Sequence, residues 1–270
     1  MSHPLCIVNA FTDGPFTGNP AGVCVLTEDM PESWMQSVAA QLNVSETAFI
    51  SPPTAAGSEV WSIRWFTPAK EVELCGHATL AAACVVWDRS LVAGQDVVTF
   101  ATRTRGQLAC RRVGEQIQLD LPADMPAPCP VPAGLAEALG ISIAETWRTT
   151  EDDVLLVLDN ESAVRSITPN YALLKDIDCR GVAITARADD SSDVDVVSRF
   201  FCPRLAVDED PVTGSLHASL GQFWPPRLGR VCFNARQASP RGGQLVVETT
   251  PTGARVGGRA EVVLVGTLQC

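Results

Sequence analysis

The sequence predicts a two-domain α+β protein, and three observations lead to this prediction. The chain has 270 residues, 46% of them hydrophobic, which is close to the length at which a single core divides into two. A segment with five prolines in thirteen residues, 122–134, separates two halves, because it can neither continue a helix nor pair centrally in a sheet. Each half contains strand patterns, a tight glycine-containing turn and one helix of small apolar residues, so the architecture repeats.

The first half begins with two strand patterns, at 6–11 and 21–26, joined by a loop rich in glycine, proline and asparagine. A short helix is expected at 33–43, where Ser33 and Gln36 have the spacing of a capping box. Further strand patterns follow at 45–50 and 59–67. Three more, at 96–106, 107–115 and 116–123, are expected to form an antiparallel meander.

The second half shows the same kinds of elements in a similar order. It has a strand pattern, a helix, two more strands, a glycine-containing turn that opens a second small-residue helix, and two final hairpins. These elements are expected at 153–159, 172–177, 181–188, 194–203, 208–224, 229–236, 243–250 and 260–269.

Charge and composition exclude several classes of partner and location. The 20 Lys and Arg residues against 31 Asp and Glu give a net charge of −11, and the positive charges are scattered, so no nucleic-acid partner is expected. The first residues do not have the pattern of an export signal, and the longest apolar run, "LAAACVVW", is too short for a bilayer. We therefore expect a cytoplasmic protein without membrane contact.

The ten cysteines are expected to be reduced thiols, and their spacing predicts no metal site.

Two turns at the starts of the small-residue helices are the first candidates for a functional site. The helix from about residue 78 is apolar on every side, so it is expected to be buried, and its first N–H groups then need a partner other than bulk water. An anionic ligand would provide one, helped by the helix dipole. The turn residues are Cys75, Gly76 and His77 in the first half, and Thr213, Gly214 and Ser215 in the second.

Two acids add proton chemistry to these turns. Glu46 stands at the start of the strand "SETAFI", and a carboxylate in a partly apolar pocket can take up and return protons near neutral pH. Asp210 lies in "DEDP" beside the second turn, where the helix field favours its ionised form. The residues alone also allow a structural interpretation, in which Glu46 is a surface acid, "DEDP" a solvated loop and the Cys-Gly-His triplet an ordinary turn.

Four motifs carry a resemblance to a known family. They are "VNAFTDGPFTGNPAGV", "NVSETAFI", "IRWFTPAKEVELCGHATLAAA" and "DEDPVTGSLHASL", and in this order they resemble the PhzF-like (phenazine biosynthesis) family. The resemblance implies the diaminopimelate-epimerase fold: two pseudo-symmetric domains, each a β-sheet wrapped around a central helix, with the active site in the cleft between them. It implies domains at 1–122 and 123–258, a last strand at 259–270 that returns to the first domain, and a homodimer.

The resemblance also assigns roles to individual residues. Glu46, His77 and Asp210 match the family's catalytic residues, with Glu46 as the group that moves a proton between two carbons of an unsaturated carboxylic acid. Neither a metal nor an organic cofactor takes part. The expected substrate-binding residues are Asn19, Cys75, Gly76, Thr213, Gly214 and Ser215.

The leading hypothesis is therefore a cofactor-independent isomerase that shifts a proton within a small carboxylate-bearing metabolite. One alternative is an amino- or hydroxy-acid racemase or epimerase. The related racemases use two cysteines, one at each helix start, and here the matching pair is taken as Cys75 and Asp210. Another alternative is a non-catalytic protein that binds a metabolite or a protein partner. The motifs do not distinguish among substrates or pathways.

Overall fold

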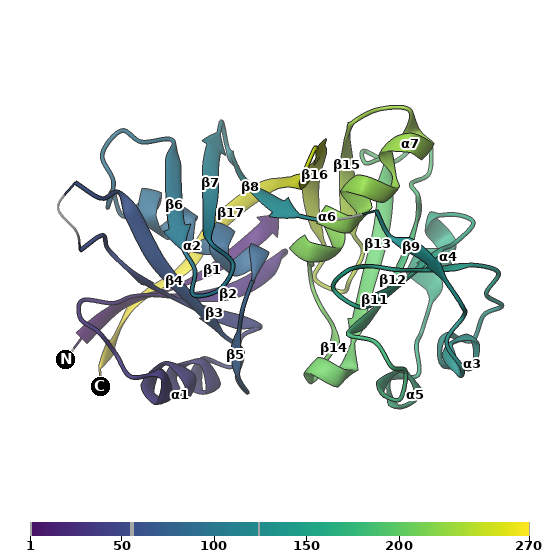
Figure 1. Cartoon of the computed structure of the whole chain (residues 1–270), viewed down its shortest axis with the longest axis horizontal. Coiled ribbons are helices and arrows are strands. Elements are labelled where there is room, and N and C mark those ends of the chain that lie inside the picture. The colour runs from purple at the N-terminus through teal and green to yellow at the C-terminus, as the bar shows by residue number, and fades with distance from the viewer. Residues whose placement is uncertain (1, 55–56, 124, 270) are drawn as a thin grey trace. The chain divides into compact units, whose positions relative to one another are not determined.

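A computed structural model describes residues 2–54, 57–123 and 125–269 (Figure 1). The chain forms two compact units of mixed α and β structure. Unit 1 comprises Met1–Asp120 and Gly257–Cys270, and unit 2 comprises Leu121–Val256. These boundaries lie two residues before the predicted ones at 122 and 258. Among the described residues, no helix is both long and apolar enough to cross a membrane.

Unit 1 is built on strands that surround one buried helix. Its elements are β1 (Ser2–Thr12), β2 (Asn19–Val25), α1 (Glu32–Leu42), β3 (Glu46–Ser51), β4 (Val60–Phe66), β5 (Glu71–Val72), α2 (Gly76–Asp88), β6 (Val97–Ala101), β7 (Gln107–Val113), β8 (Gln116–Pro122) and β17 (Gly253–Gln269). The strands β6, β7 and β8 form the predicted antiparallel meander. The end of the chain lies beside its beginning, because β17 pairs antiparallel with β1 from Ser2 opposite Gln269 to Thr12 opposite Arg259.

The α2 helix forms the centre of unit 1 (Figure 1). Nine of its thirteen residues are buried, and it contacts β1, β2, β3 and β7. This burial follows from its composition, since a helix with apolar residues on every side gains from contact in every direction. The helix starts at Gly76, slightly earlier than the predicted start near residue 78.

Unit 2 has a comparable set of elements. They are β9 (Ala127–Cys129), α3 (Leu135–Leu139), β10 (Thr146–Arg148), β11 (Asp153–Val157), α4 (Glu161–Ser166), α5 (Tyr171–Lys175), β12 (Gly181–Arg187), β13 (Val196–Cys202), a 3-10 turn η1 (Pro203–Leu205), β14 (Val207–Glu209), α6 (Gly214–Phe223), α7 (Pro225–Leu228), β15 (Cys232–Gln237) and β16 (Gly243–Thr250). The helix α6 is buried along most of its length and contacts β16 and α7.

The two units share one order of strand pairings. In unit 1 the pairs are antiparallel for β1 and β2, parallel for β2 and β3, antiparallel for β3 and β4, and parallel for β4 and β6. In unit 2 the same succession joins β10, β11, β12, β13 and β15. A short strand, β5 or β14, lies antiparallel on the fourth strand just before the buried helix. The internal repeat expected from the sequence is therefore present as a repeat of topology.

The repeat extends to individual side chains. Arg64 on β4 binds Glu71 on β5 through two hydrogen bonds of 2.7 and 2.8 Å, and Arg199 on β13 binds Glu209 on β14 through two of 2.7 and 2.9 Å. Each guanidinium also lies over a phenylalanine of its own strand, 5.1 Å from the ring centroid in unit 1 and 4.9 Å in unit 2. The same ion pair therefore occupies the same strand positions in both units. Glu71 and Glu209 are equivalent residues, and the residues that follow them can be aligned between the units.

Several local predictions need correction. The capping box is wrong, because the N-cap of α1 is Pro31 and no side chain caps it. Gln36 instead donates to the carbonyl of Thr67 at 2.9 Å, a tertiary contact that sequence spacing does not reveal. The proline-rich segment contains the short strand β9, which pairs with β10, and the short helices α3 and α4 were not predicted. The nine cysteines in the described part of the chain are free thiols, as expected.

Candidate active site

The start of α2 gathers the predicted residues of unit 1. Cys75 is the N-cap, with extended backbone (φ −145°), and its side chain makes no capping hydrogen bond. Its carbonyl accepts hydrogen bonds from both the backbone N–H and the hydroxyl of Thr79. The thiol is buried and lies 3.5 Å from Nδ1 of His77. The first turn of α2 is thus not capped by the side chain of its N-cap residue, which suits a helix start that receives an anion.

His77 connects the other members of this cluster through its two ring nitrogens. Nδ1 lies 3.3 Å from the amide nitrogen Nδ2 of Asn19, and Nε2 lies 3.3 Å from Oε2 of Glu46, although this second contact lacks the alignment of a good hydrogen bond. An amide nitrogen can only donate, so Nδ1 must accept, and in a neutral ring the proton then resides on Nε2. This assignment places the proton of His77 on Nε2, the ring nitrogen that lies 3.3 Å from Oε2 of Glu46.

The ring is neutral near pH 7 because it is buried. Burial lowers the pKa of His77 to about 3. A charged ring would also bring its Nδ1–H against the N–H of Asn19. Glu46 is the more accessible partner, with 21% of its side chain exposed against 7% for His77. The group best placed to meet a ligand is therefore the acid.

Glu46, Cys75 and His77 also have the donor types of a metal site, and their ligand atoms all lie within 4.8 Å of one another. The sequence did not indicate this cluster, because Glu46 lies far from the other two along the chain. The histidine ring, however, faces the thiol with Nδ1 and the carboxylate with Nε2, whereas an imidazole binds one metal ion through one nitrogen. The three groups are thus arranged as a chain of polar contacts around the ring.

The start of α6 gathers the predicted residues of unit 2. Thr213 is the N-cap, Gly214 is the first helical residue, and Ser215 follows it. The hydroxyl of Thr213 donates a short hydrogen bond to Oδ2 of Asp210. Ser215 accepts a hydrogen bond of 3.1 Å from Arg180, which also binds the buried carboxylate of Asp153. The structure thus brings all four predicted residues of this unit to one helix start.

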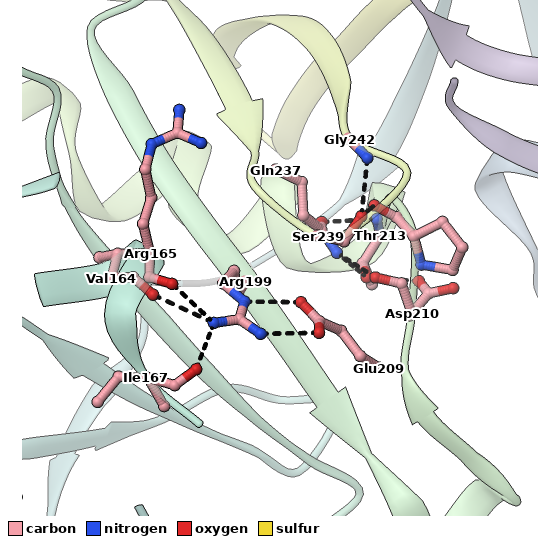
Figure 2. Close-up of polar contacts among 11 residues, drawn as sticks. Val164, Arg165, Ile167, Arg199, Glu209, Asp210, Thr213, Gln237, Ser239 and Gly242 are labelled. Carbon is pink, nitrogen blue, oxygen red and sulfur yellow. Dashed lines mark hydrogen bonds and ion pairs between the residues drawn. The ribbon is translucent and has the colours of Figure 1, made fainter. Parts of the chain in front are cut away.

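Further side chains hold this turn, among them Gln237, Arg199 and Ser239, which donates to the carbonyl of Pro211, and sequence reasoning missed all three (Figure 2). Gln237 at the end of β15 contacts Asp210 and Thr213 through its amide group. Arg199 binds Glu209 and donates to the carbonyls of Val164, Arg165 and Ile167. A glutamine at a strand end and an arginine within an apolar strand carry no motif, so only their burial in the folded chain reveals them.

The repeat corrects one prediction about matching positions. The N-cap Cys75 lies four positions after Glu71, and the N-cap Thr213 lies four positions after Glu209. The counterpart of Cys75 is therefore Thr213, not Asp210. The counterpart of Asp210 is Val72 on β5. The earlier assignment failed because it compared reactive side chains near each helix start rather than backbone positions.

The counterpart of Glu46 is not an acid either. Glu46 begins β3 opposite Ala21 of β2, and Gly181 begins β12 opposite Asp153 of β11. A side chain at Gly181 is excluded by packing, since a Cβ there would lie 2.3 Å from the ring of Phe200. Unit 2 therefore has no acid at the position that Glu46 occupies in unit 1.

A hollow of about 510 Å³ opens elsewhere on unit 2. It is lined mostly by apolar side chains, with Arg227, Glu145 and Asp159 among them. None of the predicted site residues lines it. We therefore place the candidate site residues of each unit at the start of its own buried helix, where the titratable groups of that unit lie, and not in this hollow.

Comparison with known proteins gives the family. The model of the family described as "phenazine biosynthesis-like protein" (PhzC-PhzF) matches residues 8–267. The chain belongs to this PhzF family. An uncharacterised isomerase of Pseudomonas aeruginosa is 44% identical over 261 residues, which cover 97% of this chain and 96% of that protein. The resemblance predicted from four motifs is thus confirmed over nearly the whole length.

Solved structures agree with this membership. A PhzF-family protein of Enterococcus faecalis superposes with a TM-score of 0.92 at 40% identity and covers 100% of both chains. A hydroxyproline epimerase of Agrobacterium vitis superposes with a TM-score of 0.63 at 12% identity, over 99% of this chain and 92% of that one. The second likeness is one of fold alone.

Proposed function

We propose that this PhzF-family protein is a cofactor-independent isomerase that shifts a proton within a small carboxylate-bearing metabolite, with Glu46 as its acid and base. The observation that carries the proposal is the contact chain from Asn19 through His77 to Glu46. It presents a neutral imidazole N–H to a partly exposed carboxylate, beside a helix start suited to an anion. The name isomerase on relatives about 40% identical supports the same class.

The proposed reaction needs one proton and no redox partner. The carboxylate of Glu46 takes a proton from a substrate carbon, and the electron pair of the broken C–H bond delocalises into the adjacent unsaturated system. The resulting carboxylic acid then returns the proton to a different carbon, which restores Glu46. In the resting state the Nε2 side of His77 faces the charged carboxylate of Glu46. Between the two steps Glu46 is a neutral acid and the negative charge lies on the substrate, where the Nε2–H of His77 stabilises a charged oxygen. The start of α2, in the same unit as Glu46, binds the substrate's own carboxylate.

The two-base alternative receives less support from the repeat. Inversion of a stereocentre requires a base on each face of the carbon, and related racemases use a thiol at each helix start. Here the counterparts of Glu46, Cys75 and His77 in unit 2 are Gly181, Thr213 and Ser215, and none of them accepts a proton near neutral pH. Asp210 remains the base that the racemase hypothesis requires. The labelling experiment described next distinguishes that hypothesis from the proposed isomerase.

The test is solvent-deuterium incorporation, followed by NMR, into a panel of small cyclic and unsaturated carboxylic acids and chiral amino acids. We expect the wild-type protein to label an unsaturated acid at the carbon that receives the proton, and Glu46→Gln to bind that acid without labelling it. Labelling of a chiral amino acid with loss of optical rotation, abolished by Cys75→Ser, would favour the racemase instead. Binding across the panel without any labelling would favour the non-catalytic binding protein.

A further inference from the structure

The side chain of Gln237 is buried, and all its hydrogen bonds go to the turn that carries Asp210 (Figure 2). Its Oε1 accepts from the backbone N–H of Thr213 at 2.8 Å. Its Nε2 donates to the carbonyl of Asp210 at 2.7 Å and to the hydroxyl of Thr213 at 3.2 Å. These partners fix the orientation of the amide, because a flipped amide would oppose donor to donor and acceptor to acceptor.

The fixed amide determines where the proton of Thr213 points. The hydroxyl oxygen of Thr213 accepts from Nε2 of Gln237, so its own proton is free to donate in another direction, and Oδ2 of Asp210 lies there. The result is a directed chain from the amide through the hydroxyl to the carboxylate. A hydrogen bond received by a carboxylate stabilises its ionised form relative to its protonated form.

The fold itself does not require this glutamine. Gln237 ends β15 and pairs with Ser198 of β13. Ser198 stands directly before Arg199, so its counterpart in unit 1 is Ile63, directly before Arg64. The strand β6 pairs Ala101 with Ser62, and the residue that follows Ala101, and so matches Gln237, is Thr102. Unit 1 therefore forms the same corner without an amide, and it also has Val72 where unit 2 has Asp210. The glutamine and the aspartate appear together in the unit that departs from the repeat.

We propose that Gln237 is a positioning residue that, through Thr213, keeps Asp210 ionised and fixed at the start of α6. The proposal concerns the charge state of Asp210 and rests on the proposed function only for what that charge does to a substrate. Other titratable or charged groups around the turn come from several elements, and each is present in all variants below: Asp208 and Glu209 on β14, Arg199 on β13, His217 on α6, and Arg180 with Asp153 behind Ser215.

The test is a ¹³C NMR titration of the aspartate side-chain carboxyls in the full chain, with the Asp210 signal assigned by its absence in Asp210→Asn. Gln237→Glu has almost the same shape, but at neutral pH its carboxylate can only accept. The Thr213 hydroxyl then turns toward it, and Asp210 loses a donor and gains a negative neighbour. We expect the titration of Asp210 to move to higher pH by about one unit.

Two further variants make the result specific. Thr213→Val removes the hydroxyl without a large change of shape, and we expect it to move the Asp210 titration in the same direction. Gln222→Glu is the matched control, because Gln222 also donates to two backbone carbonyls of unit 2, those of Thr250 and Gly253, away from the turn. It is expected to leave the Asp210 titration where the wild type has it.

An unchanged Asp210 titration in folded Thr213→Val would overturn the proposal, since that variant breaks the chain without introducing a buried charge. A shift of equal size in Gln222→Glu would overturn it too, because the effect would then come from added charge alone. The titration needs no substrate. Failure of the deuterium-labelling test would therefore leave this result intact, and the two proposals can fail separately.

Discussion

His77 links the polar residues of unit 1 through its two ring nitrogens. Asn19 determines the tautomer by donating to Nδ1, and the remaining N–H then faces Glu46 at 3.3 Å. A neutral histidine in this position can donate to the acid without neutralising it by a full ion pair. Glu46 consequently stays able to gain and lose a proton, which the proposed reaction requires.

This assignment predicts the protonation of His77 directly. Because burial lowers the pKa of His77 to about 3, the ring should remain neutral, with its proton on Nε2, from pH 8 down to pH 5. A ¹⁵N NMR titration of histidine-labelled protein, with the signal assigned through His77→Gln, measures both the tautomer and the charge. A transition of this ring near its ordinary pKa of 6.5, or a proton on Nδ1, would contradict the account.

At this scale the sequence indicated candidate residues but not their partners. Glu46, His77 and Asp210 were identified through motifs, but no pattern places a strand-starting acid beside a histidine of a later helix. Gln237 was missed entirely, because the identity of a buried polar residue's partner depends on tertiary structure. The matching of Asp210 to the backbone position of Cys75 was wrong, because nearness to a helix start is not the same as an equivalent backbone position.

At the scale of elements, α2 and α6 place the functional groups because each begins directly after a short strand. The carboxylates of Glu71 and Glu209 anchor those strands to their neighbours, and the N-cap of each helix lies four positions after its glutamate. The side chain of the fourth helical residue, Thr79 or His217, bonds back to the N-cap carbonyl in both units. The burial of α2 was predictable, since its apolar residues leave no polar face.

The buried His217 gives α6 a predictable sensitivity to acid. Burial lowers its pKa to about 4, although its hydrogen bond to the Thr213 carbonyl acts in the opposite direction. Between about pH 4 and 6.5 the unfolded chain binds a proton at this residue and the folded chain does not, so stability rises with pH through this window and is lost as pH falls. His217→Gln should therefore lose about 2 kcal/mol less between pH 7.5 and pH 5 than the wild type in urea unfolding. An identical loss in both proteins would refute this.

The pair of Asp153 and Arg180 offers a second test at this scale. The carboxylate of Asp153 is 1% exposed and receives two hydrogen bonds from the guanidinium that supports Ser215. Arg180→Leu should lower the free energy of unfolding by about 3–5 kcal/mol, because it leaves a buried charge unpaired. The double variant Arg180→Leu, Asp153→Leu should recover part of that loss. Arg204→Leu, whose partner Asp178 is exposed, is the control and should change stability little.

At the scale of the whole molecule, the two units differ in how the chain builds them. Unit 2 is one continuous segment with its own core, formed by residues such as Leu135, Val154, Ile184 and Phe201. Unit 1 is discontinuous, because β17 supplies the strand beside β1. The proline-rich segment indicated a division near the right place, but its position cannot reveal that the end of the chain returns, since that depends on a strand pairing between distant residues.

This difference predicts how fragments behave. The isolated segment 121–256 should fold and unfold cooperatively in urea, whereas 1–120 should not, because its first strand lacks the partner that 257–269 provides. Addition of a synthetic peptide spanning 257–269 to the 1–120 fragment should restore dispersed NMR signals. Cooperative folding of 1–120 alone would show that β17 is dispensable.

Glu46 is proposed here as the single acid and base of a proton shift. The most direct measurement is the initial rate of solvent-deuterium incorporation into whichever carboxylic acid the wild-type protein labels, compared between Glu46→Gln and Glu73→Gln, an exposed acid of the same unit paired with Arg105. We expect Glu46→Gln to lose a factor of about 10² to 10⁴ and Glu73→Gln to match the wild type. Wild-type labelling rates in Glu46→Gln would contradict the assignment.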